Sequence, residues 1–183
     1  MSTIKEVVGR EILDSRGNPT VEVTLTLEDN TTATAAVPSG ASTGTFEAHE
    51  LRDQNPYRYG GLGVLGAINF INTELRETVL GIESSDQSAV DAALIACDGT
   101  ENKSRVGANA ILGISLAAAR ASALSRGVPL YQHIADLMKI EIDPEHFPIP
   151  MFNILNGGKH SDSGLSVQEF KLIPSGISTY PEQ

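Results

Sequence analysis

The sequence contains no tryptophan and only one cysteine, Cys97. A single cysteine cannot form a disulfide within the chain, which excludes the small secreted domains held by disulfide frameworks and suits a reducing compartment. Aromatic residues make up only 5% of the chain, but 40% of its 183 residues are hydrophobic. That share is ample for a core, and the length indicates one or two domains.

Positive charge is also scarce, because 13 Lys and Arg stand against 23 Asp and Glu and give a net charge of −10. An acidic surface repels phosphate backbones, so nucleic acid is not an expected partner. The longest uncharged apolar stretch, 106–119, is shorter than the roughly 20 residues that a membrane-spanning helix needs. No basic segment followed by an apolar stretch opens the chain. We expect a cytoplasmic protein without a membrane partner, with a surface or secreted pool as an open alternative.

Alternation of apolar and polar residues dominates the first part of the chain. It is strict over 20–27, where valines and leucines alternate with threonines and a glutamate, and this predicts a half-buried antiparallel strand. Residues 4–13 predict a preceding strand, joined to it by the turn-forming stretch 14–19. After a turn at 29–30, residues 31–37 predict the returning hairpin partner. The opening therefore predicts a three-stranded antiparallel meander.

Helical spacing of apolar residues follows the meander. Residues 62–81 predict one amphipathic helix, and 85–99 predict a second that ends near a glycine. Residues 108–125 are apolar on more than one face, which is typical of a helix buried on several sides. Residues 130–138 predict one further short helix. We expect its His133 to be exposed or to be a satisfied polar residue.

Three prolines within 141–150 prevent a helix from continuing there, so this stretch predicts a linker. It separates a domain at 1–140 from a second segment at 151–183, in which residues 167–173 predict a strand. We expect residues 1–140 to fold alone and residues 150–183 to remain disordered. Its apolar strand residues would be exposed beside an unpaired edge.

The second segment also concentrates residues that can carry chemistry. The sequence Asn156-Gly-Gly-Lys-His160 is followed by Gln168-Glu169-Phe170 at the start of the predicted strand. The paired glycines permit unusual backbone angles and close ligand approach, and adjacent strand residues point to opposite faces. Spacing alone fits either a catalytic loop or a surface loop with a solvated histidine and a strand-edge glutamate.

This loop and strand resemble the active-site loop and first barrel strand of the enolases. Three further segments are similar to the same family in the same order: Asp14-Ser-Arg-Gly-Asn-Pro-Thr-Val-Glu-Val23, Val37-Pro-Ser-Gly-Ala-Ser-Thr-Gly44, and Asp98-Gly-Thr-Glu-Asn-Lys103 leading into Gly107-Ala-Asn-Ala-Ile-Leu-Gly113. The resemblance covers essentially the whole chain. It implies an α+β N-terminal capping domain followed by the truncated start of a TIM-like β/α barrel, because an enolase runs well past twice this length.

The resemblance implies a phosphopyruvate hydratase, which removes water from 2-phosphoglycerate to give phosphoenolpyruvate in glycolysis and gluconeogenesis. The difficult step takes a proton next to a carboxylate, and Mg²⁺ neutralises the charge that develops. By resemblance His160 and Glu169 are catalytic residues, and both bind the substrate together with Gln168. We expect Glu169 to assist the acid step.

A second stretch of site residues belongs to the predicted lid loop. On composition alone this stretch fits a plain connector or a loop that a ligand orders. The resemblance indicates the enolase lid, made of Ser39, Gly40, Ala41, Ser42 and Thr43. It further implies that Ser42 supplies an oxygen to a Mg²⁺ ion, which prefers oxygen ligands.

Arg10 and Glu22 place charge on the predicted open face of the meander. Solvated charges of this kind contribute little to stability and fit an ordinary surface. The resemblance instead assigns both positions to a subunit interface. It therefore implies a homodimer for a full-length chain.

The resemblance also says what is missing. In enolases the base lysine, the main acid glutamate, the carboxylates of the first Mg²⁺ site and the phosphate-binding arginine come later in the chain, so we expect residues 1–183 alone to show no dehydratase activity. Ser161 and Ser163 stand where enolases commonly place Ala and Asn, which changes the hydrogen bonds of the loop. The alternative function is a non-catalytic acidic interaction module. A reading frame that continues past Gln183 into βα units would discriminate against it.

Overall fold

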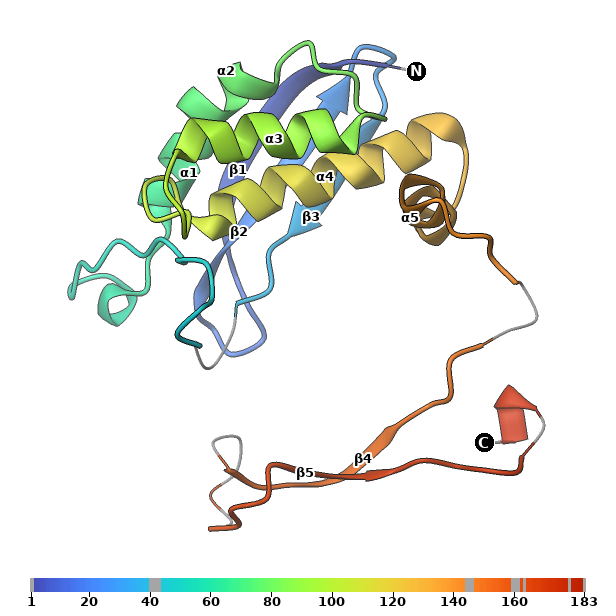
Figure 1. Ribbon diagram of the computed structural model, residues 1–183. Helices are drawn as coiled ribbons and strands as arrows, with labels where there is room; N and C mark the ends of the chain where they lie inside the picture. Colours follow the sequence, from blue (N-terminus) through green and yellow to red (C-terminus); the bar gives the residue numbers. More distant parts are fainter. Residues whose placement is uncertain are drawn as a thin grey trace. The chain divides into compact units, whose positions relative to one another are not determined.

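The structure, a computed structural model, describes residues 2–39, 44–143, 147–158, 162, 164–177 and 179–182. The chain divides into two compact units, Met1–Glu141 and Ile142–Gln183. The first unit combines a sheet with helices, whereas the second contains a two-stranded hairpin (Figure 1).

The first unit is built on a three-stranded antiparallel sheet in the order β1-β2-β3. The strands are β1 (Ile4–Leu13), β2 (Pro19–Leu27) and β3 (Thr32–Ala36). The predicted meander is thus confirmed. The apolar residues of β2 form a buried row beneath the helices: Val21, Val23, Leu25 and Leu27. Threonines of β2 and β3 pair across the opposite face, since Thr24 lies 3.0 Å from Thr34 between hydroxyl oxygens.

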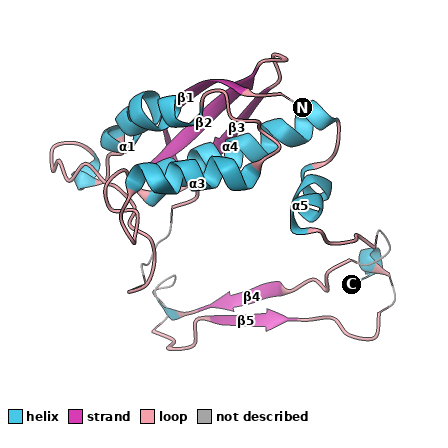
Figure 2. Ribbon diagram, turned by 45° about the horizontal axis from the view of Figure 1, so that its top comes forward, coloured by secondary structure: helices cyan, strands magenta, loops and turns pink. Residues whose placement is uncertain are grey.

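The helices of the first unit follow the sheet in sequence. They are η1 (Tyr59–Gly61), α1 (Leu65–Phe70), the π-helical η2 (Ile71–Leu75), α2 (Arg76–Val79), α3 (Gln87–Asp98), α4 (Ala108–Arg126) and α5 (Leu130–Met138). The three elements α1, η2 and α2 form one continuous helix where 62–81 predicted one, but its middle turn is π-helical. Figure 2 shows α3 and α4 side by side across one face of the sheet.

Helix α4 approaches the sheet closely because its buried face consists mostly of small residues. A Cβ atom added at Gly113 would lie only 2.7 Å from Cγ2 of Val23 on β2. Within the described part of the chain, α4 alone is long and apolar enough to cross a membrane by length and composition, and half of that stretch is buried. Packing against the sheet accounts for this apolar character, as in a core helix.

Side chains cover both edges of the sheet. At β1, Asn72 of η2 accepts from the backbone N–H of Gly9 at 2.7 Å and donates to its carbonyl oxygen at 3.0 Å. A Cβ at Gly9 would meet Ile71 at 2.7 Å, so this close approach requires glycine. At β3, Arg120 of α4 donates to the carbonyl oxygen of Thr34 at 2.8 Å. Because unpaired strand edges template association with other chains, these bonds protect the sheet.

The second unit contains the antiparallel strands β4 (Phe152–Asn156) and β5 (Glu169–Leu172), followed by a short 3₁₀ turn, η4 (Tyr180–Glu182). Strand β5 lies within the predicted strand at 167–173, whereas β4 was missed because apolar and polar residues do not alternate along it. Every residue of both strands is exposed. A lone two-stranded hairpin is marginally stable in water, so the low stability expected for this segment stays a prediction.

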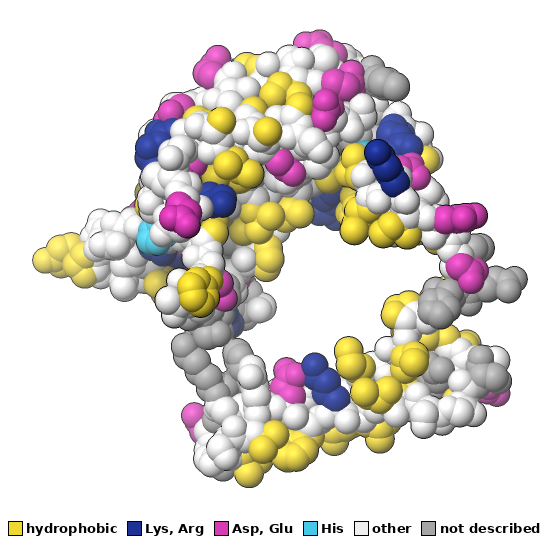
Figure 3. All heavy atoms as spheres, in the orientation of Figure 1, with side chains coloured by type: hydrophobic (Ala, Val, Ile, Leu, Met, Phe, Trp, Pro, Cys, Tyr) yellow, Lys and Arg dark blue, Asp and Glu magenta, His cyan; other side chains and the backbone are white. Residues whose placement is uncertain are grey.

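Helix α5 decides between the two expectations for His133, because this residue is completely buried and is hydrogen-bonded through one ring nitrogen. Its Nδ1 accepts from Nη1 of Arg126 at 2.7 Å, and Arg126 also pairs with Asp136 at 2.6 Å. Burial and then the nearby Arg126 lower the pKa of His133, while Asp136 opposes them. The apolar residues Tyr131, Ile134 and Leu137 of α5 are exposed instead. Figure 3 shows apolar side chains at the surface of the molecule.

We predict that the free energy of unfolding falls as the pH drops below about 6.5, the ordinary pKa of histidine. The folded pKa of His133 is lowered, so the unfolded chain takes up the proton more readily. Its stabilisation is therefore complete above this pH and is lost toward the folded pKa. Urea unfolding between neutral pH and about pH 5 measures this slope.

His133→Gln is the matched variant, since glutamine offers an acceptor to Arg126 but does not titrate. It should be less stable than the parent at neutral pH by about 1–3 kcal/mol and should lose most of the slope. Equal slopes in the two proteins would contradict the assignment.

Candidate functional site

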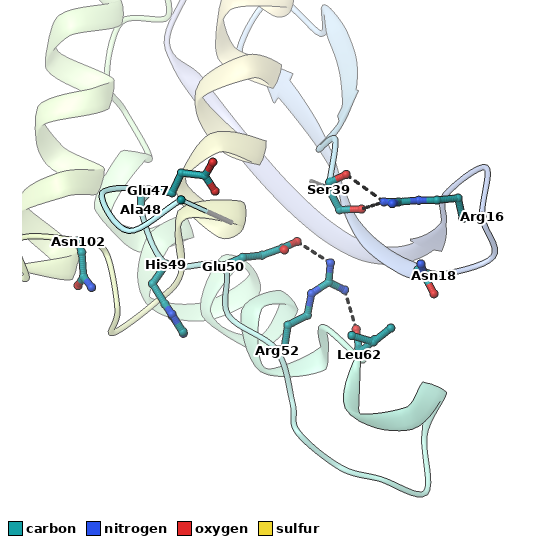
Figure 4. Close-up of a pocket in the computed structure, with 11 residues that line it drawn as sticks. Arg16, Asn18, Ser39, Glu47, Ala48, His49, Glu50, Arg52, Leu62 and Asn102 are labelled. Atoms are coloured by element: carbon teal, nitrogen blue, oxygen red, sulfur yellow. Dashed lines mark hydrogen bonds and ion pairs between the residues drawn. The ribbon is translucent and has the colours of Figure 1, made fainter. Parts of the chain in front are cut away.

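A cavity of about 600 Å³ lies beside the predicted lid loop in the first unit. Of this loop only Ser39 is described, since Gly40, Ala41, Ser42 and Thr43 lie outside the described residues. Ser39 and Gly44, which flank the undescribed stretch, both line the cavity. Its walls are polar and charged, and Figure 4 shows the side chains that line it, among them Arg16, Asn18, Glu47, His49, Glu50, Arg52 and Asn102.

The turn between β1 and β2 holds Ser39 in place. The Ser39 hydroxyl donates to Asp14 Oδ2 at 3.1 Å. Arg16 Nη2 donates to the Ser39 carbonyl oxygen at 3.1 Å (Figure 4). Asp14 also accepts from the backbone N–H groups of Asn18 and Arg16, at 2.9 and 2.8 Å. The bond from Asn18 is the largest cause that lowers the pKa of Asp14, while partial burial opposes it. The Asp14 carboxylate thus connects the turn to Ser39, the first residue of the predicted lid.

Arg52 fixes the opposite side of the cavity. Its Nη1 donates to the carbonyl oxygens of Pro19 and Leu62, both at 2.6 Å, and its Nη2 donates to Glu50 at 2.6 Å. With both terminal nitrogens engaged by the protein, Arg52 acts as a structural tie between the start of β2 and the cavity wall. These three hydrogen bonds occupy N–H donors of Arg52 that would otherwise be free for a bound anion.

His49 is fixed at the cavity wall through its backbone. Its N–H donates to the carbonyl oxygen of Asn102 at 2.7 Å, and its own carbonyl accepts from Ala108 at 2.7 Å. Two residues later, the buried Asn109 side chain bridges the N–H and carbonyl oxygen of Leu51, both at 3.1 Å. Sequence pattern could not associate Leu51 with Asn109, because the two residues are 58 positions apart.

Asp98 organises the loop that carries Asn102. The buried carboxylate accepts from the backbone N–H groups of Thr100, Arg105 and Val106 at 2.9, 3.1 and 2.8 Å, and from the Thr100 hydroxyl. Burial is the largest influence on the pKa of Asp98 and raises it, but these hydrogen bonds together outweigh burial and lower it. The Asp98–Lys103 motif therefore has a structural purpose, since it shapes the loop against which the cavity wall rests.

The two residues predicted for a subunit interface lie together on the open face of the sheet. Arg10 and Glu22 are opposite one another in the register of β1 and β2, and they form an ion pair. The Arg10 side chain is 62% exposed. Their presence on an exposed face is compatible with an interface, whose existence stays a prediction.

In the second unit the structure places Glu169 at the start of β5, opposite Asn156 of β4. Its Oε2 lies 2.8 Å from Nζ of Lys171, which sequence reasoning missed although residues two apart on a strand share a face. The carbonyl oxygen of Gln168 accepts from the N–H of Gly157 at 2.9 Å. His160 lies outside the described residues. The hairpin thus brings Gln168 and Glu169 beside Gly157 and Gly158.

The described residues around the cavity offer mainly oxygen atoms as potential metal ligands. Within the described ranges, no three His, Cys, Asp or Glu side chains gather in a group that could hold a metal ion. Hydroxyl, amide and carboxylate oxygens nevertheless line the cavity, and hard cations such as Mg²⁺ prefer such donors.

Two family models match the chain. The model of the enolase N-terminal domain matches residues 4–134, and that of the enolase C-terminal TIM barrel domain matches residues 144–183. The first match spans the sheet and nearly all of the helices of the first unit. The second covers a stretch far shorter than the roughly 250 residues of a closed barrel.

Asn109→Ala should lower the free energy of unfolding by about 1–3 kcal/mol, because the backbone groups of Leu51 lose their partner. Amide exchange at Leu51 and His49 should become faster, which hydrogen exchange read by mass spectrometry measures. Asn69→Ala, exposed on α1, is the matched control and should cost no more than about 0.5 kcal/mol. Unchanged exchange at both sites in Asn109→Ala would contradict the bridging role.

Proposed function

Because the chain belongs to the enolase family, a family of lyases, we propose that it forms the N-terminal domain and first barrel segment of a Mg²⁺-dependent phosphopyruvate hydratase. The two domain models match in the order of an enolase. The observation that supports catalysis most is the hairpin, which sets Glu169 at the start of a strand beside Gly157 and Gly158. A carboxylate at such a position can reach a ligand that approaches the glycine backbone closely.

In the proposed reaction, Glu169 assists proton transfer to the leaving 3-hydroxyl of 2-phosphoglycerate. Its ion pair with Lys171 orients the carboxylate along the strand. Gln168 binds the substrate, and its backbone carbonyl is held by Gly157. His160, on the loop between the two strands, binds the substrate as well. Each assignment follows the match of this segment to the barrel family.

Magnesium, when bound, would neutralise the negative charge that builds up on the substrate carboxylate. Ser42 would give it one oxygen, and the remaining ligands would come from substrate, water and residues beyond this chain. Ser39 stands three positions before Ser42, and its bonds with Asp14 and Arg16 fix the end of the lid.

The remaining proposals concern partners and location. The full-length protein is a homodimer whose interface includes Arg10 and Glu22, which lie on an exposed sheet face. Its ligands are the small molecules 2-phosphoglycerate and phosphoenolpyruvate, and it works in cytoplasmic glycolysis. The net charge of −10 opposes binding to nucleic acid.

The intact mass and activity of the native gene product test this proposal together. We expect a mass far above 19.4 kDa, by roughly the mass of a barrel of about 250 residues. The product should convert 2-phosphoglycerate to phosphoenolpyruvate, measured by ultraviolet absorbance, and the 183-residue chain alone should not. A native product of 19.4 kDa without activity would overturn the proposal and favour an acidic interaction module.

Glu169→Gln in the native-length product should lower kcat by about 10²–10⁴-fold, the usual contribution of a positioned acid or base. KM should change much less, because glutamine keeps the size and one acceptor oxygen of the side chain. Glu141→Gln, at an exposed position of the first unit, is the matched control and should leave both constants unchanged. An unaltered kcat in Glu169→Gln would remove Glu169 from the mechanism.

A further inference from the structure

The hairpin of the second unit contains an Asn-Gly dipeptide, Asn156-Gly157, at the end of β4. Asn156 is the only asparagine of the chain that precedes a glycine. Its side chain is exposed, and Gly157 has no side chain to hinder attack by its own backbone nitrogen. We propose that Asn156 is a site of spontaneous deamidation, promoted by Asn153 and controlled by opening of the hairpin.

The proposed reaction needs only water. The backbone nitrogen of Gly157 gives up its proton and attacks Cγ of Asn156, forming a new C–N bond. The bond from Cγ to Nδ2 then breaks, and ammonia leaves with the proton it has gained. The resulting five-membered succinimide is opened by water at either carbonyl. The products are aspartate and isoaspartate at position 156.

Asn153 lies where it would stabilise the charge that forms in the first step. Its Nδ2 donates to Oδ1 of Asn156 at 2.6 Å. As the nitrogen of Gly157 adds to Cγ, this oxygen takes up negative charge. A donor already aimed at the oxygen lowers the barrier, as donors do in an oxyanion hole. The neighbouring asparagine therefore promotes the reaction.

Pairing of the hairpin opposes the same reaction. The N–H of Gly157 donates to the carbonyl oxygen of Gln168 at 2.9 Å, so its nitrogen is engaged while the strands stay paired. Gly157 itself is buried, but every residue of the two strands is exposed, so little burial beyond position 157 resists opening. Local opening exposes the nitrogen without unfolding the first unit. The rate of deamidation thus reports how often the hairpin opens.

The fold also explains why the reactive glycine is present. A Cβ atom at position 157 would lie 2.2 Å from the carbonyl oxygen of Val167 and 2.8 Å from Cβ of Leu165. No larger residue fits there without moving the backbone. The close approach that shapes the hairpin therefore requires glycine after Asn156.

The chain contains its own control in Asp98-Gly99, the only aspartate followed by glycine. Aspartate forms the same succinimide, with loss of water in place of ammonia. The Asp98 carboxylate, however, is buried and accepts hydrogen bonds from three backbone N–H groups and one hydroxyl. Held in this way it cannot turn toward the nitrogen of Gly99. We expect isoaspartate at 156 and none at 98.

Deamidation would alter the proposed site, a consequence that rests on the proposed function. Asn156 faces Glu169 in the register of the hairpin. An aspartate there would place two carboxylates opposite one another, and like charges in that position destabilise a strand pair. It would also compete with Glu169 for Lys171.

The test is peptide mapping of the full 183-residue chain after incubation at neutral and mildly alkaline pH. The peptide that contains Asn156 should gain about 1 Da, the exchange of an amide for a carboxyl group, and an isoaspartyl methyltransferase should label it. Asn156→Gln should abolish the gain at this position. No gain at 156 in the folded chain, while a free peptide of the same sequence reacts, would overturn the proposal.

Asn153→Ala tests the promoting role. It should slow the gain at 156 about two- to tenfold, the rate equivalent of one hydrogen bond. Exchange of the Gly157 amide is measured in the same samples, so that a change in hairpin opening is separated from a change in chemistry. An unchanged or faster reaction at equal amide exchange would overturn the role of Asn153. None of these measurements depends on dehydratase activity, so their failure and that of the proposed function are distinguishable.

Discussion

Close contact between α4 and β2 is the constraint on which the first unit depends. At Gly113 the helix approaches Val23 so closely that even a methyl group would overlap it. The sheet offers a flat row of valines and leucines, and the helix meets it with alanines and a glycine. This arrangement buries apolar area on both elements at once, at about 25 cal/mol per Å². Helices α3 and α5 pack against α4, so the position of α4 also determines theirs.

The same contact determines where the cavity lies. Helix α4 begins directly after Gly107, where a Cβ would lie 2.5 Å from Cβ of Leu51, and its first turn carries Asn109. Asn109 bonds to Leu51, so the position of the helix fixes the wall that contains His49. Core packing and the candidate site are therefore linked through one helix end.

The sequence was sufficient wherever structure follows from local pattern. Strict alternation over 20–27 and dense small residues over 108–125 specify elements whose partners lie in the same core, and the meander and core helix were predicted from them. Local sequence pattern could not reveal contacts between distant residues. Burial of His133 accompanies its bond to Arg126, and the π-helical turn η2 accompanies bonds to a distant strand. The glycine loop and its following strand were found from the motif. The cavity wall was not, because buried polar side chains join segments far apart in sequence.

The covered edges of the sheet bear on how the protein is made. Asn72 and Arg120, which close the two edges, both precede the second unit in the chain. Synthesis runs from the N-terminus at about 5–20 residues per second, and domains fold as units in that order. The first unit can thus complete its sheet on the ribosome with side chains already translated. The bonds at Gly9 and Thr34 can therefore form before the second unit has been synthesised.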